Sequence, residues 1–149
     1  MRIFKAFFPI SYADTDAGGV VYHSRYIDMA ERARMAMLHE LGIRCRDLEK
    51  AEKPCGFMIH KLEIDYKRPA FLEDDLTVET QVLKIGGATF DLLQTVKRGD
   101  ETLVEMKVYA LAVAGVGKPT RIPASIREKL TESMEKIKAR FCFPLRFVS

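Results

Sequence analysis

The chain has no run of apolar residues long enough to cross a bilayer, and its net charge is only +3. So mild a charge permits anionic ligands but gives no argument for nucleic acid binding. Cysteine is scarce as well, because Cys45, Cys55 and Cys142 are odd in number and form no CxxC pair. The sequence therefore indicates neither a disulfide framework nor a zinc site, and a reducing cytoplasm is the simplest compartment.

The rest of the composition is typical of a folded domain. Of the 149 residues, 48% are hydrophobic and 30% are charged, which is a globular balance. This length suits a single domain with its own core, and no linker or internal repeat divides residues 1–149. The opening stretch MRIFKAFFPISYADTD lacks a small-residue cleavage site, so it predicts a first strand rather than a signal peptide.

The hydrophobic period changes along the chain from a helical to a strand repeat. Apolar residues recur at helical spacing from Tyr26 to Leu41, and the narrow polar face predicts a well-buried helix. Alternating apolar and polar residues then predict strands that are separated by Gly, Pro and Asp turns. The predicted elements are strands over 2–11, 58–66, 76–85, 89–98 and 102–115, helices over 23–41 and 124–139, and loops over 12–22 and 43–56, the second loop with one short helical turn.

The order of these elements indicates an α+β fold. The turns between the last four strands are short, which predicts an antiparallel meander with the apolar strand over 102–115 at its centre. A sheet that is apolar on one face needs a cover, and the helix over 23–41 is the only strongly apolar one. We therefore expect an antiparallel sheet of about five strands wrapped around a long central helix, plus a C-terminal helix. This is the hotdog arrangement, although the pattern alone leaves other α+β sandwiches open.

The end of the chain is apolar for an exposed terminus. A stripe of Ile126, Leu130, Met134 and Ile137 predicts that the helix over 124–139 packs on the domain surface. The segment FCFPLRFVS at 141–149 is expected to dock on the domain or on a second copy of the chain. A peripheral contact with a membrane or another partner is the alternative for this segment.

The segment over 12–34, YADTDAGGVVYHSRYIDMAERAR, contains the residues best suited to chemistry. It places Asp16 and two glycines just before a helix that starts near His23. Helix N-termini present unpaired N–H groups and a partial positive charge, which can hold the oxyanion formed when a carbonyl is attacked. A carboxylate nearby could attack that carbonyl or activate a water, while Gly18 and Gly19 let the backbone approach a ligand. Taken alone, these parts are generic, because an Asp before a helix is more often a turn or cap residue.

The same string closely resembles the signature of the 4-hydroxybenzoyl-CoA thioesterase-like family, especially its YbgC-type branch of Tol-Pal-associated thioesterases. The shared pattern is D-T-D-A-G-G-V-V-Y-H at 14–23, followed by Tyr26 and by E-R-A-R at 31–34. YKRPA at 66–70 and KPTRIP at 118–123 extend the resemblance over nearly the whole chain. The resemblance implies a hotdog acyl-CoA thioesterase that needs no metal or other cofactor. It also implies a site built between the subunits of a dimer or homotetramer.

The resemblance assigns roles position by position. Asp16 matches the catalytic carboxylate, and the backbone N–H of His23 matches the donor that polarises the thioester carbonyl. The His23 side chain matches a residue used near the thioester and Tyr12 matches a tyrosine flanking the same pocket, so both are candidate catalytic residues beside Asp16. The motif residues expected to contact substrate are Gly18, Gly19, Val20, Tyr22 and Tyr26. Whether Asp16 attacks the carbonyl or deprotonates a water stays open.

Other charged residues are expected to have bracing or phosphate-binding roles. Asp14 should brace the loop, and Glu31 should form a salt bridge with one of the helix arginines at 25, 32 and 34. The phosphates of CoA need cations. Four basic residues at strand ends or just after the sheet are the candidates, namely Lys84, Arg98, Lys118 and Arg121.

The expected partners are an acyl-CoA substrate and further copies of the chain. Acyl carrier protein presents the same phosphopantetheine thioester and is an alternative carrier. Three competing interpretations are a hotdog hydratase or dehydratase, a non-catalytic acyl-CoA-binding module, and a membrane-associated partner protein. A dehydratase usually pairs a His with a helix carboxylate, as His23 and Glu31 could, but the string DTDAGG has no natural place in that chemistry.

Overall fold

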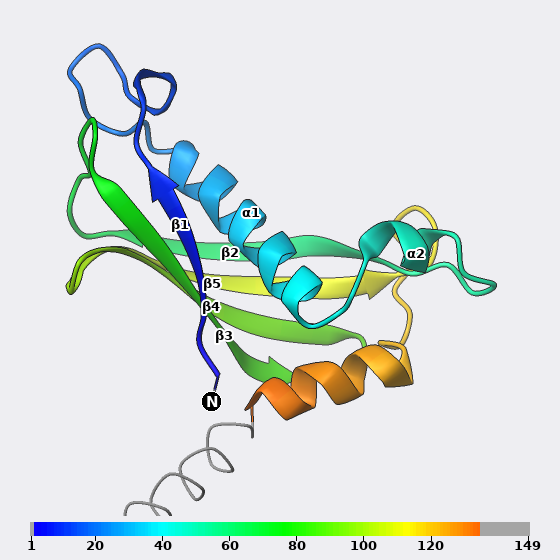
Figure 1. The fold of residues 1–149 in the computed structure, drawn as a ribbon. Helices are drawn as coiled ribbons and strands as arrows, with labels where there is room; N and C mark the ends of the chain where they lie inside the picture. Colours follow the sequence, from blue (N-terminus) through cyan, green and yellow to red (C-terminus); the bar gives the residue numbers. More distant parts are fainter. Residues whose placement is uncertain (1, 135–149) are drawn as a thin grey trace, which may run out of the picture.

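The computed structural model describes residues 2–134, in which a five-stranded antiparallel sheet carries a long helix across one face (Figure 1). The elements are β1 (Phe4–Pro9), a 3-10 turn (Tyr12–Asp14), α1 (Arg25–Glu40), α2 (Cys45–Glu49), β2 (Gly56–Tyr66), β3 (Asp75–Ile85), β4 (Thr89–Arg98) and β5 (Glu101–Val113). A further helix runs over 124–134. The predicted hotdog arrangement is confirmed, and α2 is the predicted short helical turn.

The strand order corrects one part of the prediction. The sheet runs β1-β3-β4-β5-β2, so only β3, β4 and β5 form a meander. β2 pairs with β5 instead of β3, from Gly56 opposite Val113 to Tyr66 opposite Val104. The connection over 67–74 is long enough to pass the ends of β5 and β4, so β2 need not pair with the next strand in the chain. β5 is an inner strand as expected, but β4 lies in the middle.

The strand pairing defines two ends of the sheet. At one of them, which we call the near end, β1, β2 and β4 end and β3 and β5 begin. The near end lies to the left in Figure 1. Pro9, the last residue of β1, pairs there with Asp75, so the loop over 10–24 begins at the near end. β2 and β4 begin, and β3 and β5 finish, at the opposite, far end. α1 crosses the sheet from the near end toward the far end (Figure 1).

α1 buries one face and leaves the other open. Its buried side chains are Tyr26, Met29, Ala30, Ala33, Met37 and Leu38. On the opposite face Met35 is 50% exposed, so the prediction of a well-buried helix is right for one side only. The apolar residues at 35 and 36 that narrowed the polar face in the sequence therefore remain on the surface of this chain.

A buried amide joins α1 to the sheet. The Gln94 side chain is fully buried and donates to the Ala30 carbonyl at 2.9 Å and to Thr80 Oγ1 at 3.0 Å. Its Oε1 accepts a hydrogen bond from the Arg34 guanidinium at 3.0 Å. A buried amide is stabilising only when its donors and acceptor are satisfied, as they are here. The cluster therefore holds the helix at one position over the sheet.

The helix over 124–134 closes the far end of the core. Ile126 and Leu130 are buried, as the predicted stripe requires. The Arg127 guanidinium donates to the carbonyls of Gly86 and Gly87, which tie the helix to the β3–β4 turn. Ile137 and the segment at 141–149 lie outside the described residues. Among the described residues, none of the helices is both long enough and apolar enough to span a membrane.

Candidate active site

The loop over 10–24 is tied to the 67–74 connection at the near end of the sheet. The Ile10 N–H donates to the Asp74 carbonyl, and the Ile10 carbonyl accepts from the Glu73 N–H, both at 2.9 Å. After the turn, the Val21 N–H donates to the Ala70 carbonyl at 2.9 Å. Both arms of the loop are therefore fixed on the same segment, so the start of α1 has a defined position.

Asp16 sits in a tight turn between these arms. Its Oδ1 accepts from the backbone N–H groups of Gly18 at 2.9 Å and Val20 at 3.3 Å, while its own N–H donates to the Val20 carbonyl. Gly19 adopts φ of 81°, a conformation that favours glycine. The side chain of Asp16 is exposed, and its Oδ2 makes no hydrogen bond with a described residue. One carboxylate oxygen holds the turn and the other is free for chemistry.

The start of α1 presents unpaired N–H groups close behind this turn. Ser24 is the residue before the helix, and within residues 2–134 its side chain makes no capping hydrogen bond. The Arg25 N–H donates to the Tyr22 carbonyl at 2.9 Å, but the N–H groups of His23 and Ser24 donate to no described residue. Such a terminus carries a partial positive charge and favours a negative oxygen.

A hollow of about 320 Å³ lies beside the helix start. Its lining residues are Val20, Val21, His23, Tyr26, Tyr66, Lys67, Arg68 and Pro69. Tyr26 is buried and its hydroxyl accepts from the Ala70 N–H at 3.0 Å, while the Tyr66 hydroxyl donates to the His23 carbonyl at 2.9 Å. Burial raises the pKa of both phenols, so they remain neutral near pH 7.

The residues predicted around Asp16 fall into two groups. Val20, His23 and Tyr26 line the hollow, whereas Asp16, Gly18 and Gly19 form the turn beside it. Tyr12 is 80% exposed, and Tyr22 packs its ring against the His23 ring with 4.3 Å between centroids. Asp14 braces the loop as predicted, because its carboxylate accepts from the Ser11 N–H and hydroxyl.

The candidate phosphate ligands do not gather at this hollow within one chain. Lys84, Lys118 and Arg121 are exposed near the far end of the sheet, and Lys84 lies about 30 Å along β3 from Asp75. Arg98 lies at the near end but is already paired with Asp74 and Glu101, each at 2.7 Å. Arg98 therefore braces the 67–74 connection instead of offering a free charge.

Lys67 and Arg68, which were not predicted as site residues, line the hollow beside His23. Both belong to the YKRPA string that carries the family resemblance, and that was the available signal. Their charges are partly used, because Lys67 lies 3.6 Å from Glu105 and Arg68 lies 2.6 Å from Glu101. Both side chains remain exposed at the rim of the hollow.

The salt bridge predicted for Glu31 is wrong. Among the described residues Glu31 has no ion pair within 4 Å, and Arg25 pairs with Asp28 at 3.3 Å instead. Burial lowers the pKa of Arg34, and the Glu31 carboxylate partly offsets that effect from a greater distance. Helical spacing allowed several partners for each charge, and side-chain conformation selected among them.

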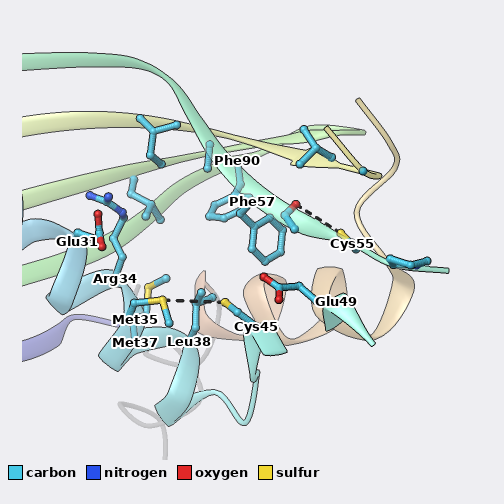
Figure 2. A pocket seen from close by; sticks show the side chains of 17 residues that line it. Glu31, Arg34, Met35, Met37, Leu38, Cys45, Glu49, Cys55, Phe57 and Phe90 are labelled. Atoms are coloured by element: carbon cyan, nitrogen blue, oxygen red, sulfur yellow. Dashed lines mark hydrogen bonds between the residues drawn. The ribbon is translucent and has the colours of Figure 1, made fainter. Parts of the chain in front are cut away.

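A second hollow of about 640 Å³ lies farther along α1, between α1, α2 and the sheet (Figure 2). Its surface is mainly apolar and includes Met35, Leu38, Phe57 and Phe90, with Glu31 and Arg34 at one side. Cys45 and Cys55 also line it, and burial raises the pKa of both thiols, which disfavours reactive thiolates. Asp16 and His23 do not line this hollow.

No group of three or more His, Cys, Asp or Glu side chains within residues 2–134 is arranged to hold a metal ion. The groups that the near end offers among the described residues are a carboxylate, backbone N–H groups and phenols. A carboxylate beside a helix start can attack a carbonyl or activate a water while the helix start holds the oxyanion. This arrangement is suited to acyl transfer to water.

Comparison with known proteins points the same way. The family model of the thioesterase-like superfamily matches residues 10–130. The chain is 39% identical over 123 residues to the acyl-CoA thioesterase YbgC of Haemophilus influenzae, covering 80% of this chain and 90% of that protein. It is 34% identical over 121 residues to the acyl-CoA thioester hydrolase YbgC of Escherichia coli, covering 78% and 87%. The crystal structure of a probable thioesterase from Bartonella henselae matches with a TM-score of 0.78 and 32% identity, covering 81% and 99%.

The ion pairs of Arg98 predict an acid-dependent stability. Partial burial raises the pKa of Asp74, but hydrogen bonds from the Phe71 N–H and the Arg98 guanidinium outweigh this effect, so the pKa is lowered. Hydrogen bonds from Arg98 and, to a smaller extent, from Arg68 also lower the pKa of Glu101. Carboxyls with lowered pKa values stabilise the fold above their unfolded-state pKa, and this contribution is lost as pH falls below about 4. Arg98→Met should therefore make the free energy of unfolding less dependent on pH between about 5 and 3.

Chemical denaturation at a series of pH values measures this dependence. Arg121→Met is the matched control, because it removes one positive charge from an exposed site near the far end. The control should keep the full acid dependence of the unmodified chain. Equal acid dependence in Arg98→Met and the unmodified chain would contradict the bracing role of Arg98.

Proposed function

The chain belongs to the thioesterase-like superfamily and is an acyl-CoA thioester hydrolase, and we propose that Asp16 is its catalytic carboxylate. One observation carries the proposal: Asp16 keeps a free Oδ2 in a turn directly before an open helix start. The turn interpretation and the catalytic interpretation of Asp16 are compatible, because each uses a different oxygen. The family resemblance at 14–23 supports the same assignment.

In the proposed reaction, the thioester carbonyl lies at the start of α1. The N–H of His23 stabilises the oxyanion that develops when the carbonyl carbon is attacked. Asp16 either attacks that carbon, giving a mixed anhydride and the CoA thiolate, or removes a proton from an attacking water. On the first route a water hydrolyses the anhydride and restores Asp16; on the second the tetrahedral intermediate collapses and expels the CoA thiolate. Both routes give the free acid and CoA, and the thiolate leaves without strong acid assistance. In heavy-oxygen water, label entering Asp16 during a single turnover supports the anhydride route.

Neighbouring motif residues are proposed to shape the site. The side chains of His23 and Tyr12 are both exposed, and we assign them to the entry path of the thioester. Gly18 and Gly19 leave the approach to the Asp16 carboxylate clear of side chains, which suits close contact with a substrate. Val20 and Tyr26 form part of the apolar wall of the smaller hollow, and Tyr22 supports the His23 ring from outside.

We propose that the working enzyme is a homo-oligomer and that a second copy completes the site. β2 is a long edge strand of 11 residues, and its Met58 and Ile59 are 42% and 36% exposed. Unpaired strand edges of this length favour pairing with another chain. Antiparallel pairing of two β2 edges places the far end of one copy beside the near end of the other. Lys118 and Arg121 of the partner copy are then candidate ligands for the CoA phosphates, with Lys84 a more distant one.

The remaining assignments are proposals of the same kind. A cytoplasmic enzyme formed by one hotdog domain agrees with the cysteine content and with the length of the chain. A homotetramer would be built from two such dimers. Acyl carrier protein remains an alternative carrier because it presents the same thioester as CoA. A peripheral membrane contact would rest on the segment at 141–149, outside the described residues.

Asp16→Asn tests the catalytic assignment. Asparagine keeps an Oδ1 acceptor for the N–H groups of Gly18 and Val20, so the turn should persist while the charge is lost. Thiol release from acyl-CoA should fall about 100- to 10,000-fold. Asp100→Asn in the exposed β4–β5 turn is the matched control and should retain full activity. Full turnover by Asp16→Asn would refute the assignment.

Dilution tests the shared site. Light scattering should give a mass that is a multiple of the 17.0 kDa chain. On dilution, activity per chain should fall in step with the oligomer fraction, because each site loses the residues of its partner. Full specific activity in a sample shown by its mass to be monomeric would rule out a site shared between copies.

A further inference from the structure

Two of the unpaired N–H groups at the start of α1, those of His23 and Ser24, belong to peptide groups whose carbonyls each accept a hydrogen bond. The His23 N–H lies in the same peptide group as the Tyr22 carbonyl, which accepts from the Arg25 N–H at 2.9 Å. The Ser24 N–H lies in the same group as the His23 carbonyl, which accepts from the Tyr66 hydroxyl at 2.9 Å. In a planar trans peptide the N–H points opposite to the C=O, so holding the carbonyl also aims the N–H.

We propose that Tyr66 is a positioning residue for catalysis, which aims the Ser24 N–H as a second oxyanion donor beside the His23 N–H. This inference rests on the proposed function and adds a residue that the Asp16 assignment does not include. In this role Tyr66 acts on the reaction through the peptide whose carbonyl it holds, although its ring also lines the hollow. The second donor comes from the backbone, so no side chain at position 24 is required.

The position of Tyr66 suits this task. It is the last residue of β2 and pairs with Val104, so its backbone belongs to the sheet. Its ring packs edge-on against Tyr26, with 5.7 Å between ring centroids and 68° between ring planes. Tyr26 is itself buried and bonded to the Ala70 N–H. The sheet and the core thus hold the phenol, and the phenol holds the start of the helix.

The hydroxyl is not needed to hold the fold together. Tyr66 is 46% exposed, and the atoms that pack on Tyr26 belong to its ring, which phenylalanine retains. Without the hydroxyl, the His23–Ser24 peptide can rotate. The Ser24 N–H must then be oriented again in each turnover, which raises the free energy of the transition state. Removing a complete oxyanion donor costs about 100- to 1000-fold in rate, and loosening one costs a part of that.

Tyr66→Phe should therefore lower kcat about 10-fold while KM changes less than about 2-fold, because the oxyanion exists only in the transition state. The temperature of unfolding should stay the same. An acyl-CoA trifluoromethyl ketone, which adds a nucleophile to form a tetrahedral oxyanion, should bind the variant about 10-fold more weakly. The corresponding methylene ketone, which stays trigonal, should bind the variant and the unmodified enzyme equally.

Tyr109→Phe is the matched control. Its hydroxyl donates to Glu63 at 3.2 Å on the same sheet, away from the helix start, so kinetic constants should not change. Unchanged kcat in Tyr66→Phe would overturn the inference. So would a raised KM with kcat retained, which would indicate direct substrate contact, or an activity loss that follows a lower unfolding temperature. Asp16→Asn measured alongside separates the two proposals, because its full activity would refute the Asp16 assignment whatever the result for Tyr66→Phe.

Discussion

The candidate site depends on the hydrogen-bonded attachment of the loop over 10–24 to the connection over 67–74. Ile10 and Val21 fix the two arms of the loop to this connection through backbone bonds. Arg98 at the end of β4 ties this connection to the start of β5, because it pairs with both Asp74 and Glu101. Because backbone bonds set the position of the loop, the start of α1 is placed before any ligand arrives, which is the condition for electrostatic preorganisation.

Within that frame the two oxygens of the Asp16 carboxylate differ. Its Oδ1 closes the turn with Gly18 and Val20, and its Oδ2 makes no hydrogen bond with a described residue. The proposed nucleophile or base and the proposed oxyanion donors thus come from one short segment, and their relative position depends on one turn. The arrangement also explains why glycines occupy 18 and 19: a Cβ at 18 would lie 3.3 Å from the Asp16 Oδ1, and Gly19 has a positive φ.

Much of the fold could be predicted because the period of apolar residues marks strands and α1 directly. The position of β2 in the sheet could not be predicted in this way. Its pairing with β5 depends on the path of the 67–74 connection and not on the sequence of the strand itself. The hydrogen-bond and ion-pair partners of individual side chains could not be predicted from the sequence either. Arg98 looked like a free cation, Glu31 looked paired, and Tyr66 looked like one alternating position of a strand. Each of these depends on contacts between segments far apart in the sequence.

The near-end hollow and the larger hollow between α1, α2 and the sheet are both open in this chain. The position of a bound thioester group therefore decides which of the two contains the site of hydrolysis. The most direct measurement is a crystal structure of Asp16→Asn with an acyl-CoA ketone in which methylene replaces the thioester sulfur. We expect the ketone oxygen about 3 Å from the N–H groups of His23 and Ser24, with the side chain at position 16 facing the carbonyl carbon. A ketone bound away from the helix start would contradict this expectation.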